Sequence, residues 1–199
     1  GGCATITTVR ANPQQDRLER LMAAIQPHTK YPEAKMWVRV LQPTKPQADL
    51  WIFQQRHIYL SEGLVTHADD AILTALLTHG IAHHDLAHHG KRGIVRGLQS
   101  TAFLVGGFFV PGLGMGLMAA DPMMEGAMSL GQEFTADAKA VTYLEKMGSS
   151  ADDYLKALEF LASHHYVERT GGFLTKQEGF AQRIAALKRR HAAPPQGGA

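Results

Sequence analysis

The chain has 199 residues, of which 45% are hydrophobic and 19% are charged, and its formal net charge is +2. This length suits a single globular domain, and the composition is too apolar for a disordered chain. The nearly balanced charge argues against a nucleic-acid-binding protein that depends on a large basic field. One cysteine excludes an internal disulfide framework and a zinc site built from cysteines alone. Histidine is the unusual residue, because five of the 11 lie between His79 and His89.

The two ends of the chain are predicted to lie outside the folded domain. We treat residues 1–13 as an N-terminal extension and residues 192–199, which are rich in Pro and Gly, as a disordered tail. Cys3 follows two glycines, and a cysteine after a small residue at a mature amino terminus is also where bacterial lipoproteins carry their lipid. Cys3 is therefore a candidate lipid anchor, and a surface cysteine beside a cloning remnant is the alternative.

The chain after this extension predicts a helix followed by a small sheet. The helix is expected over residues 14–25, with an apolar face formed by Leu18, Leu21, Met22 and Ile25. Residues 36–41 and 50–60 are rich in β-branched and aromatic residues, which predicts two or three strands with a break near residues 54–56. The strand near residues 50–55 is expected at an edge of the sheet, where an extended peptide would add a further strand.

The rest of the chain is predicted to be helical. A long helix is expected from about residue 68 to residue 89, with Gly90 ending it. Residues 125–147 predict another helix, and two more are expected to begin after capping residues near Ser150 and Thr175. The predicted fold class is therefore α+β, mostly helical, with a small sheet preceding the histidine helix.

Residues 98–120 are uncharged and dense in Gly, Phe and Met, and they are long enough to suggest a membrane span. The pairs Gly106–Gly107 and Pro111–Gly112 interrupt this stretch at mid-depth, where a lipid-facing helix would lose backbone hydrogen bonds. We therefore favour a buried helix with a loop near the site, and keep membrane association as the alternative.

The histidine helix contains a pattern that suits a metal. His79 and His83 are four residues apart, and at about 100° per residue the second imidazole comes within roughly 40° of the first, one turn along. Two neutral imidazoles on one helix face are a common pair of zinc ligands. Taken alone, such a pair is more often a coincidence on the surface of a helix.

A carboxylate on a later helix supplies a candidate third ligand. Glu133 would complete a His, His, Glu set, which is one of the sets that hold catalytic zinc. Asp137 lies four residues further on, on the same face, where it is expected to accept a hydrogen bond from the outer nitrogen of His79. The alternative is a solvated helix face. Together with the histidine pair, the zinc interpretation is favoured.

These segments also resemble a known family. Residues 76–83, which contain Thr78-His79-Gly80-Ile81-Ala82-His83, resemble the H-E-x-x-H helix of the HtpX-like and CAAX-prenyl-protease zinc metallopeptidases. Residues 132–137 are similar to that family's E-x-x-A-D helix, and residues 58–64 to its preceding strand and turn. Residues 175–184 are similar to its C-terminal helix, in which an arginine, here Arg183, faces the site.

The resemblance implies a compact gluzincin-type metallopeptidase domain over residues 14–191. It implies one Zn²⁺ per chain and zinc-dependent endopeptidase action on a peptide or an unfolded protein. Many bacterial members are envelope proteins and some are lipoproteins, so the resemblance also implies a periplasmic location with a lipid anchor at Cys3.

The sequence departs from the family pattern at the general base. The glutamate of H-E-x-x-H takes the proton from water, and Gly80 stands at its position. Loss of a general base typically costs about 10²–10⁴-fold in rate, so this chain is expected to be weakly active or inactive. Either it is a naturally altered homologue, or the glutamate was replaced to allow binding without turnover. Arg183 is expected either to stabilise an oxyanion or to form a salt bridge.

Two other functions stay open. The first is a non-catalytic peptide- or partner-binding protein of the bacterial envelope, which the missing base favours. The second is a histidine-rich metal buffer. His84, four residues after Gly80, is a weaker candidate for a substitute base.

Overall fold

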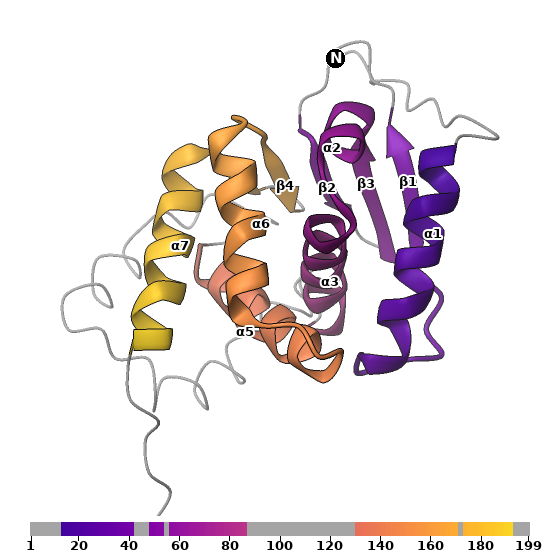
Figure 1. Ribbon diagram of the computed structural model, residues 1–199, viewed down its shortest axis with the longest axis horizontal. Coiled ribbons are helices and arrows are strands. Elements are labelled where there is room, and N and C mark those ends of the chain that lie inside the picture. Colours follow the sequence, from indigo (N-terminus) through magenta and orange to yellow (C-terminus); the bar gives the residue numbers. More distant parts are fainter. Residues whose placement is uncertain (1–12, 42–47, 54–55, 87–129, 171–172, 193–199) are drawn as a thin grey trace, which may run out of the picture.

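The computed structural model describes residues 13–41, 48–53, 56–86, 130–170 and 173–192 (Figure 1). Within these ranges the chain is mostly helical and contains one five-stranded mixed sheet. The fold is therefore α+β, as the sequence predicts. Cys3, residues 98–120 and residues 193–199 lie outside the described residues, so their predicted roles stay predictions. Ala192, predicted as the start of the disordered tail, is instead the last residue of a helix.

The sheet has the strand order β1-β3-β2-β4-β5. Its strands are β1 (Trp37–Leu41), β2 (Leu50–Phe53), β3 (His57–Ser61), β4 (Glu168–Thr170) and β5 (Phe173–Thr175). β1 runs parallel to β3, and β2 runs parallel to β4, while β3 pairs with β2 and β4 with β5 in antiparallel fashion. Buried and half-buried side chains alternate along most of β1 and β3, so one face of the sheet packs on the core.

Two predictions about the sheet are wrong. The sheet does not lie entirely before the histidine helix, because β4 and β5 follow all but one of the helices along the chain. The strand near residues 50–55 is not an edge strand, because β2 pairs with β3 on one side and β4 on the other. Both errors have one cause: short strands from distant parts of the chain pair with β2, and local pattern does not reveal them.

The helices before the site are α1 (Pro13–Ile25), α2 (Glu62–His67) and α3 (Asp70–Asp85), with a 3-10 turn, η1 (Gln26–His28), after α1. The long helix expected from about residue 68 is α3, which begins two residues later because the Asp69 side chain caps Ile72 N at 2.8 Å. It ends at Asp85, with Leu86 as its C-terminal cap.

The later helices are α5 (Leu130–Lys146), α6 (Ala151–Ser163) and α7 (Gln177–Ala192). Gly148 follows α5 with φ +83°, a left-handed conformation that glycine adopts without strain. Ser150 and Asp153 form the predicted capping box at the start of α6. Gly148 and this capping box form the short connection between α5 and α6, which pack against each other.

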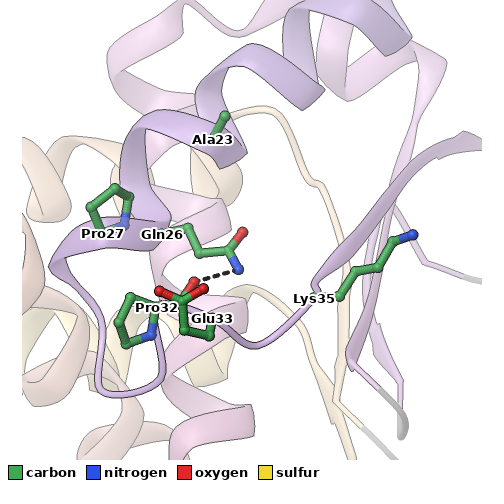
Figure 2. A pocket seen from close by; sticks show the side chains of 6 residues that line it. All are labelled: Ala23, Gln26, Pro27, Pro32, Glu33 and Lys35. Atoms are coloured by element: carbon green, nitrogen blue, oxygen red, sulfur yellow. Dashed lines mark hydrogen bonds between the residues drawn. The ribbon is translucent and has the colours of Figure 1, made fainter.

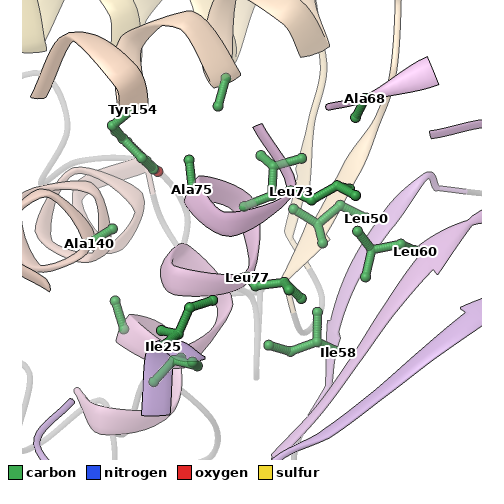
Figure 3. Close-up of a cluster of buried hydrophobic side chains, with 14 of the residues drawn as sticks. Ile25, Leu50, Ile58, Leu60, Ala68, Leu73, Ala75, Leu77, Ala140 and Tyr154 are labelled. Atoms are coloured by element: carbon green, nitrogen blue, oxygen red, sulfur yellow. The ribbon is translucent and has the colours of Figure 1, made fainter. Parts of the chain in front are cut away.

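Helix α3 lies in the middle of the molecule, between the sheet on one side and α5 and α6 on the other (Figure 1). Nearly all of its side chains from Leu73 to His83 are therefore buried. Figure 3 shows the apolar part of this core, where Leu77 of α3 and Ile58 of β3 lie on facing elements. Because α3 is enclosed on both sides, most of its buried residues are apolar, and the polar ones, among them His79 and His83, are buried with them.

No helix within the described ranges is both long and apolar enough to cross a membrane.

Candidate metal centre

Helix α3 directs two buried histidines toward the same point in the interior. His79 and His83 are both 0% exposed, and their Nε2 atoms lie 3.0 Å apart. Because they are one helical turn apart, their rings project from the same side of α3 and meet edge to face, with ring centroids 4.5 Å apart. The structure thus brings together the pair that the spacing singles out.

Two carboxylates from other elements reach the same nitrogen atoms. Glu133, in the first turn of α5, places Oε2 3.2 Å from His79 Nε2 and 3.3 Å from His83 Nε2. Glu168, in β4, places Oε1 2.9 Å from His79 Nε2. The two histidines and the two glutamates each offer one ligand atom, and these four atoms all lie within 4.8 Å of one another.

These separations match the size of a zinc coordination sphere. Zinc bonds to nitrogen and oxygen are about 2.0–2.1 Å long, so neighbouring ligands in a tetrahedral site lie roughly 3.3 Å apart. The four separations given above range from 2.9 to 3.3 Å. Imidazole and carboxylate donors also suit zinc chemically. The residues present therefore fit a zinc ion with small adjustments.

A further set of buried polar groups orients His79. Asp137 Oδ1 lies 3.2 Å from His79 Nδ1, and Tyr154 Oη lies 2.8 Å from the same nitrogen. The Tyr154 hydroxyl donates in turn to Asp137 Oδ1 at 2.5 Å. With Asp137 as acceptor, the ring proton sits on Nδ1, which leaves the Nε2 lone pair directed at the metal position.

Arg183, from α7, lies within ion-pair distance of all three carboxylates, and its Nη1 is 3.3 Å from Glu133 Oε2. It is 0% exposed, and its Nε and Nη2 donate to the two oxygens of Asp137 at 2.9 and 2.6 Å. Its Nη1 donates to Glu168 Oε2 at 2.9 Å. Of the two roles considered for Arg183, the structure shows the salt bridge.

The charges of the cluster do not balance without a cation. Glu133, Asp137 and Glu168 are each 0–1% exposed, and so is Arg183. Three carboxylates and one guanidinium leave a formal charge of −2 when both histidines are neutral. In addition, Glu133 Oε1 is buried with no hydrogen-bond partner among the described residues. Buried uncompensated charge is costly, and one divalent cation would neutralise it.

The pKa values of the histidines and of Glu133 reflect the excess of negative charge in the cluster. Burial alone would lower the pKa of His79, but Glu168, Asp137 and Glu133 outweigh burial and the pKa lies well above the usual value. Burial lowers the pKa of His83. Burial would raise the pKa of Glu133, yet the two histidines hold it well below its usual range. Without a metal, a proton on His79 therefore offsets part of the negative charge.

Gly80, the residue after His79, faces the Ile58 side chain of β3. A Cβ atom at position 80 would lie 2.5 Å from Ile58 Cδ1 and 3.0 Å from Ile58 Cγ1. The Ile58 side chain of β3 therefore fills the space that any side chain at position 80 would need first. The absence of a side chain lets α3 approach the sheet closely at this point.

Sequence reasoning missed three members of the cluster: Glu168, Tyr154 and Thr170, whose Oγ1 donates to Glu168 Oε1 at 3.1 Å. Tyr154 shares the helical spacing of Leu158 and Leu161, so its sequence pattern indicates core packing and not a site. An acidic residue inside the short stretch Val167–Thr170 is the signal that would have pointed to Glu168, because a buried strand rarely carries an unpaired carboxylate.

A surface pocket lies away from this cluster. Figure 2 shows it beside the turn after α1, where Gln26 Nε2 donates to Pro32 O at 2.9 Å. Its lining side chains are Ala23, Gln26, Pro27, Pro32, Glu33 and Lys35. With a single carboxylate and no histidine in that lining, the pocket offers no comparable donor set.

A small mixed sheet beside a helix with an i, i+4 histidine pair, joined by a glutamate from a later helix, is the arrangement of gluzincin metallopeptidases. A family model described as peptidase family M48 matches residues 12–190, and the chain belongs to this family. No curated protein was found to match the chain. Membership confirms the predicted metallopeptidase family, while the HtpX-like subgroup remains a prediction.

Proposed function

We propose that this chain is a zinc metallopeptidase domain that holds one zinc ion through His79, His83 and Glu133 and has lost most of its hydrolytic activity. Family membership supports the metallopeptidase class. The observation that carries the metal is the buried donor cluster, whose formal charge of −2 and converging ligand atoms call for a divalent cation.

Each residue of the cluster has a defined task in this proposal. When bound, zinc supplies a Lewis acid that polarises the scissile carbonyl and activates water. Asp137 and Tyr154 hold His79 through its Nδ1 atom. Arg183 is committed to Asp137 and Glu168 by its hydrogen bonds, which favours a positioning role over oxyanion stabilisation.

The proposed loss of hydrolysis rests on Gly80. A glycine has no group that can take a proton from water, and the missing general base costs about 10²–10⁴-fold in rate. Ile58 packs into the space beside it, so the site is adapted to glycine at this position. Restoring the base therefore requires room as well as a carboxylate.

The test is a gain of function. The paired variant Gly80→Glu with Ile58→Val supplies the carboxylate and removes the Ile58 Cδ1 methyl group that a new side chain would meet. Loaded with zinc, it is expected to cleave a denatured protein faster than the native chain, by up to the roughly 10²–10⁴-fold that a general base contributes. Ile58→Val alone is the matched control and should show no gain.

The paired variant is also combined with Glu168→Gln, because the Glu168 carboxylate lies 2.9 Å from His79 Nε2, at the proposed metal position. If both combinations retain zinc and neither cleaves a denatured protein or a peptide library, the peptidase assignment is wrong for this chain.

The second candidate is a non-catalytic peptide- or partner-binding protein, which the packing of Ile58 against Gly80 favours. Peptide binding by strand addition would have to use β1 or β5, since these strands end the order of the described sheet. This function predicts binding that survives His79→Ala and metal chelation. Binding that disappears on chelation argues against it.

We also propose a location in the bacterial cell envelope, with Cys3 as the lipid anchor. The support is the family resemblance and the small residue, Gly2, that precedes Cys3. Metabolic labelling with a fatty acid tests it: the label should be incorporated into the native chain and not into Cys3→Ser.

A further inference from the structure

Glu168 lies outside the three-ligand set, yet it makes the shortest contact with a ligand nitrogen. Its Oε1 atom is 2.9 Å from His79 Nε2, compared with 3.2 Å for Glu133 Oε2. It comes from β4, which is paired on both sides within the sheet, and its side chain is 0% exposed. The backbone that carries Glu168 is therefore among the most constrained near the site.

The carboxylate of Glu168 is also held in one orientation. Arg183 Nη1 donates to its Oε2 at 2.9 Å, and Thr170 Oγ1 donates to its Oε1 at 3.1 Å. A carboxylate oxygen accepts more than one partner, so Oε1 retains a lone pair on the side of His79. These contacts fix that oxygen at the metal position before any metal binds.

One arginine serves three carboxylates in this cluster. Arg183 lies 2.6 Å from Asp137 Oδ1, 2.9 Å from Glu168 Oε2 and 3.3 Å from Glu133 Oε2. Its single positive charge offsets only one of them, which leaves a formal charge of −2 when both histidines are neutral. One Zn²⁺ held by Glu133 and Glu168 would neutralise that charge.

We propose that Glu168 is a fourth protein ligand of the zinc ion and occupies the coordination position that a working peptidase leaves open. This inference rests on the proposed zinc site but not on the peptidase activity. Zinc sites with four protein ligands are structural, whereas catalytic sites keep one position for water or substrate. The centre is then closed by Glu168 in addition to lacking its base at Gly80.

Cobalt substitution tests the closure on the native chain without any variant. Cobalt(II) replaces zinc in tetrahedral sites and has a visible spectrum that changes when an added anion binds the metal. The native cobalt protein is expected to show a spectrum that azide does not alter. A spectrum that azide shifts would show an open position and overturn the inference.

A variant then assigns the closing ligand. In Glu168→Gln, the amide oxygen is expected to accept from Arg183, which turns the NH₂ group toward the metal, and an NH₂ group cannot coordinate it. Zinc affinity, measured by competition with a chelator, should fall at least about tenfold, the lower end of the loss for groups around a metal site. The cobalt spectrum should become sensitive to azide.

Glu145→Gln is the matched control, because Glu145 is exposed on α5 and its replacement removes the same charge. It should leave zinc affinity and the azide-insensitive spectrum unchanged. If Glu168→Gln behaves like Glu145→Gln, Glu168 is not a ligand. If the native chain binds neither metal, the zinc proposal itself fails and Arg183 is the only fixed cation of the cluster.

The closure also bears on the peptidase assay. The double variant Gly80→Glu with Ile58→Val would have a general base, but Glu168 would still occupy the coordination position that water or substrate needs. Adding Glu168→Gln to that pair is therefore expected to raise its cleavage rate further.

Discussion

Two adjacent faces of α3 differ in chemistry. On one face, His79 and His83 lie among fully buried carboxylates that contact Arg183 and Tyr154. On the neighbouring face, one residue along from His79, a Cβ atom at Gly80 would lie 2.5 Å from Ile58 Cδ1. Within one helical turn, α3 thus presents a polar cluster and a close apolar contact with the sheet, and the two can be tested separately.

The polar face should be the more sensitive to mutation. Arg183→Met leaves Asp137 and Glu168 buried without their partner, and breaking a buried ion pair in this way costs about 3–5 kcal/mol. Lys188→Met on the same helix removes an exposed pair with Glu159, worth about 0–1 kcal/mol. Denaturant unfolding of both variants measures the difference. Equal losses would show that the buried network contributes no more than a surface ion pair.

The packing of α3 against Ile58 can be tested by comparing alanine substitutions at two helical glycines. Gly80→Ala places a methyl group against the terminal Cδ1 of Ile58, and overpacking of this kind costs about 1–3 kcal/mol. Since alanine in a helix interior gains about 1 kcal/mol over glycine, the net effect should be a loss of about 0–2 kcal/mol. Gly63→Ala, in α2, meets nothing within 4 Å and should stabilise the fold by about 0.4–1 kcal/mol. Thermal unfolding distinguishes the two. A stabilised Gly80→Ala would mean that Ile58 moves aside freely, and the packing argument would be lost.

The pH dependence of metal binding sharpens the charge argument. The pKa of His79 is raised well above its usual value in the metal-free chain, so near neutral pH zinc must displace a proton from this ring. Zinc affinity should therefore rise by about tenfold per pH unit up to that raised pKa, as one proton is released per metal. Chelator competition from pH 6 to pH 8, a range chosen around the ordinary pKa of about 6.5, measures the slope. A flat profile would contradict the assignment of His79 as a ligand.

The smallest effect is expected far from the site, at the start of α6. Ser150→Ala removes the capping box and should cost about 1 kcal/mol. Ser149→Ala is its control, since Ser149 is the preceding serine and the box is formed by Ser150 with Asp153. Lys156 and Ser150 hold the pKa of Asp153 below its usual value. The contribution of the cap is therefore full above the unfolded pKa, about 3.9, and is lost as the pH falls through the lower folded value. If the two alanine variants unfold alike, the cap is not formed.

The part of the site that local spacing determines was predictable. His79 and His83 share a face because a helix repeats every 3.6 residues, and Glu133 and Asp137 share one for the same reason. The helix containing each pair is also recognisable from its pattern. Spacing alone does not show that the helix with the histidines and the helix with the carboxylates meet. The family resemblance implied that they do.

The part that depends on distant strand pairing was not predictable. Glu168 reaches the site because β4 pairs with β2, more than a hundred residues earlier in the chain, and three-residue strands carry too little pattern to reveal their partners. The same pairing moved β2 from the predicted edge to the interior. The chain from Glu62 to Asp85 forms two helices, α2 and α3, because the side chains of Ser61 and Asp69 each cap the start of one. The local sequence allows these caps but does not require them.

The measurement that tests the central claim most directly is the metal content of the purified chain after equilibration with zinc and removal of excess. We predict one zinc ion per native chain and a substoichiometric amount in Glu133→Gln, which retains the size of the side chain but not its charge. A folded native chain that retains no zinc would contradict the account, because the buried charge of the cluster would then be compensated without a metal.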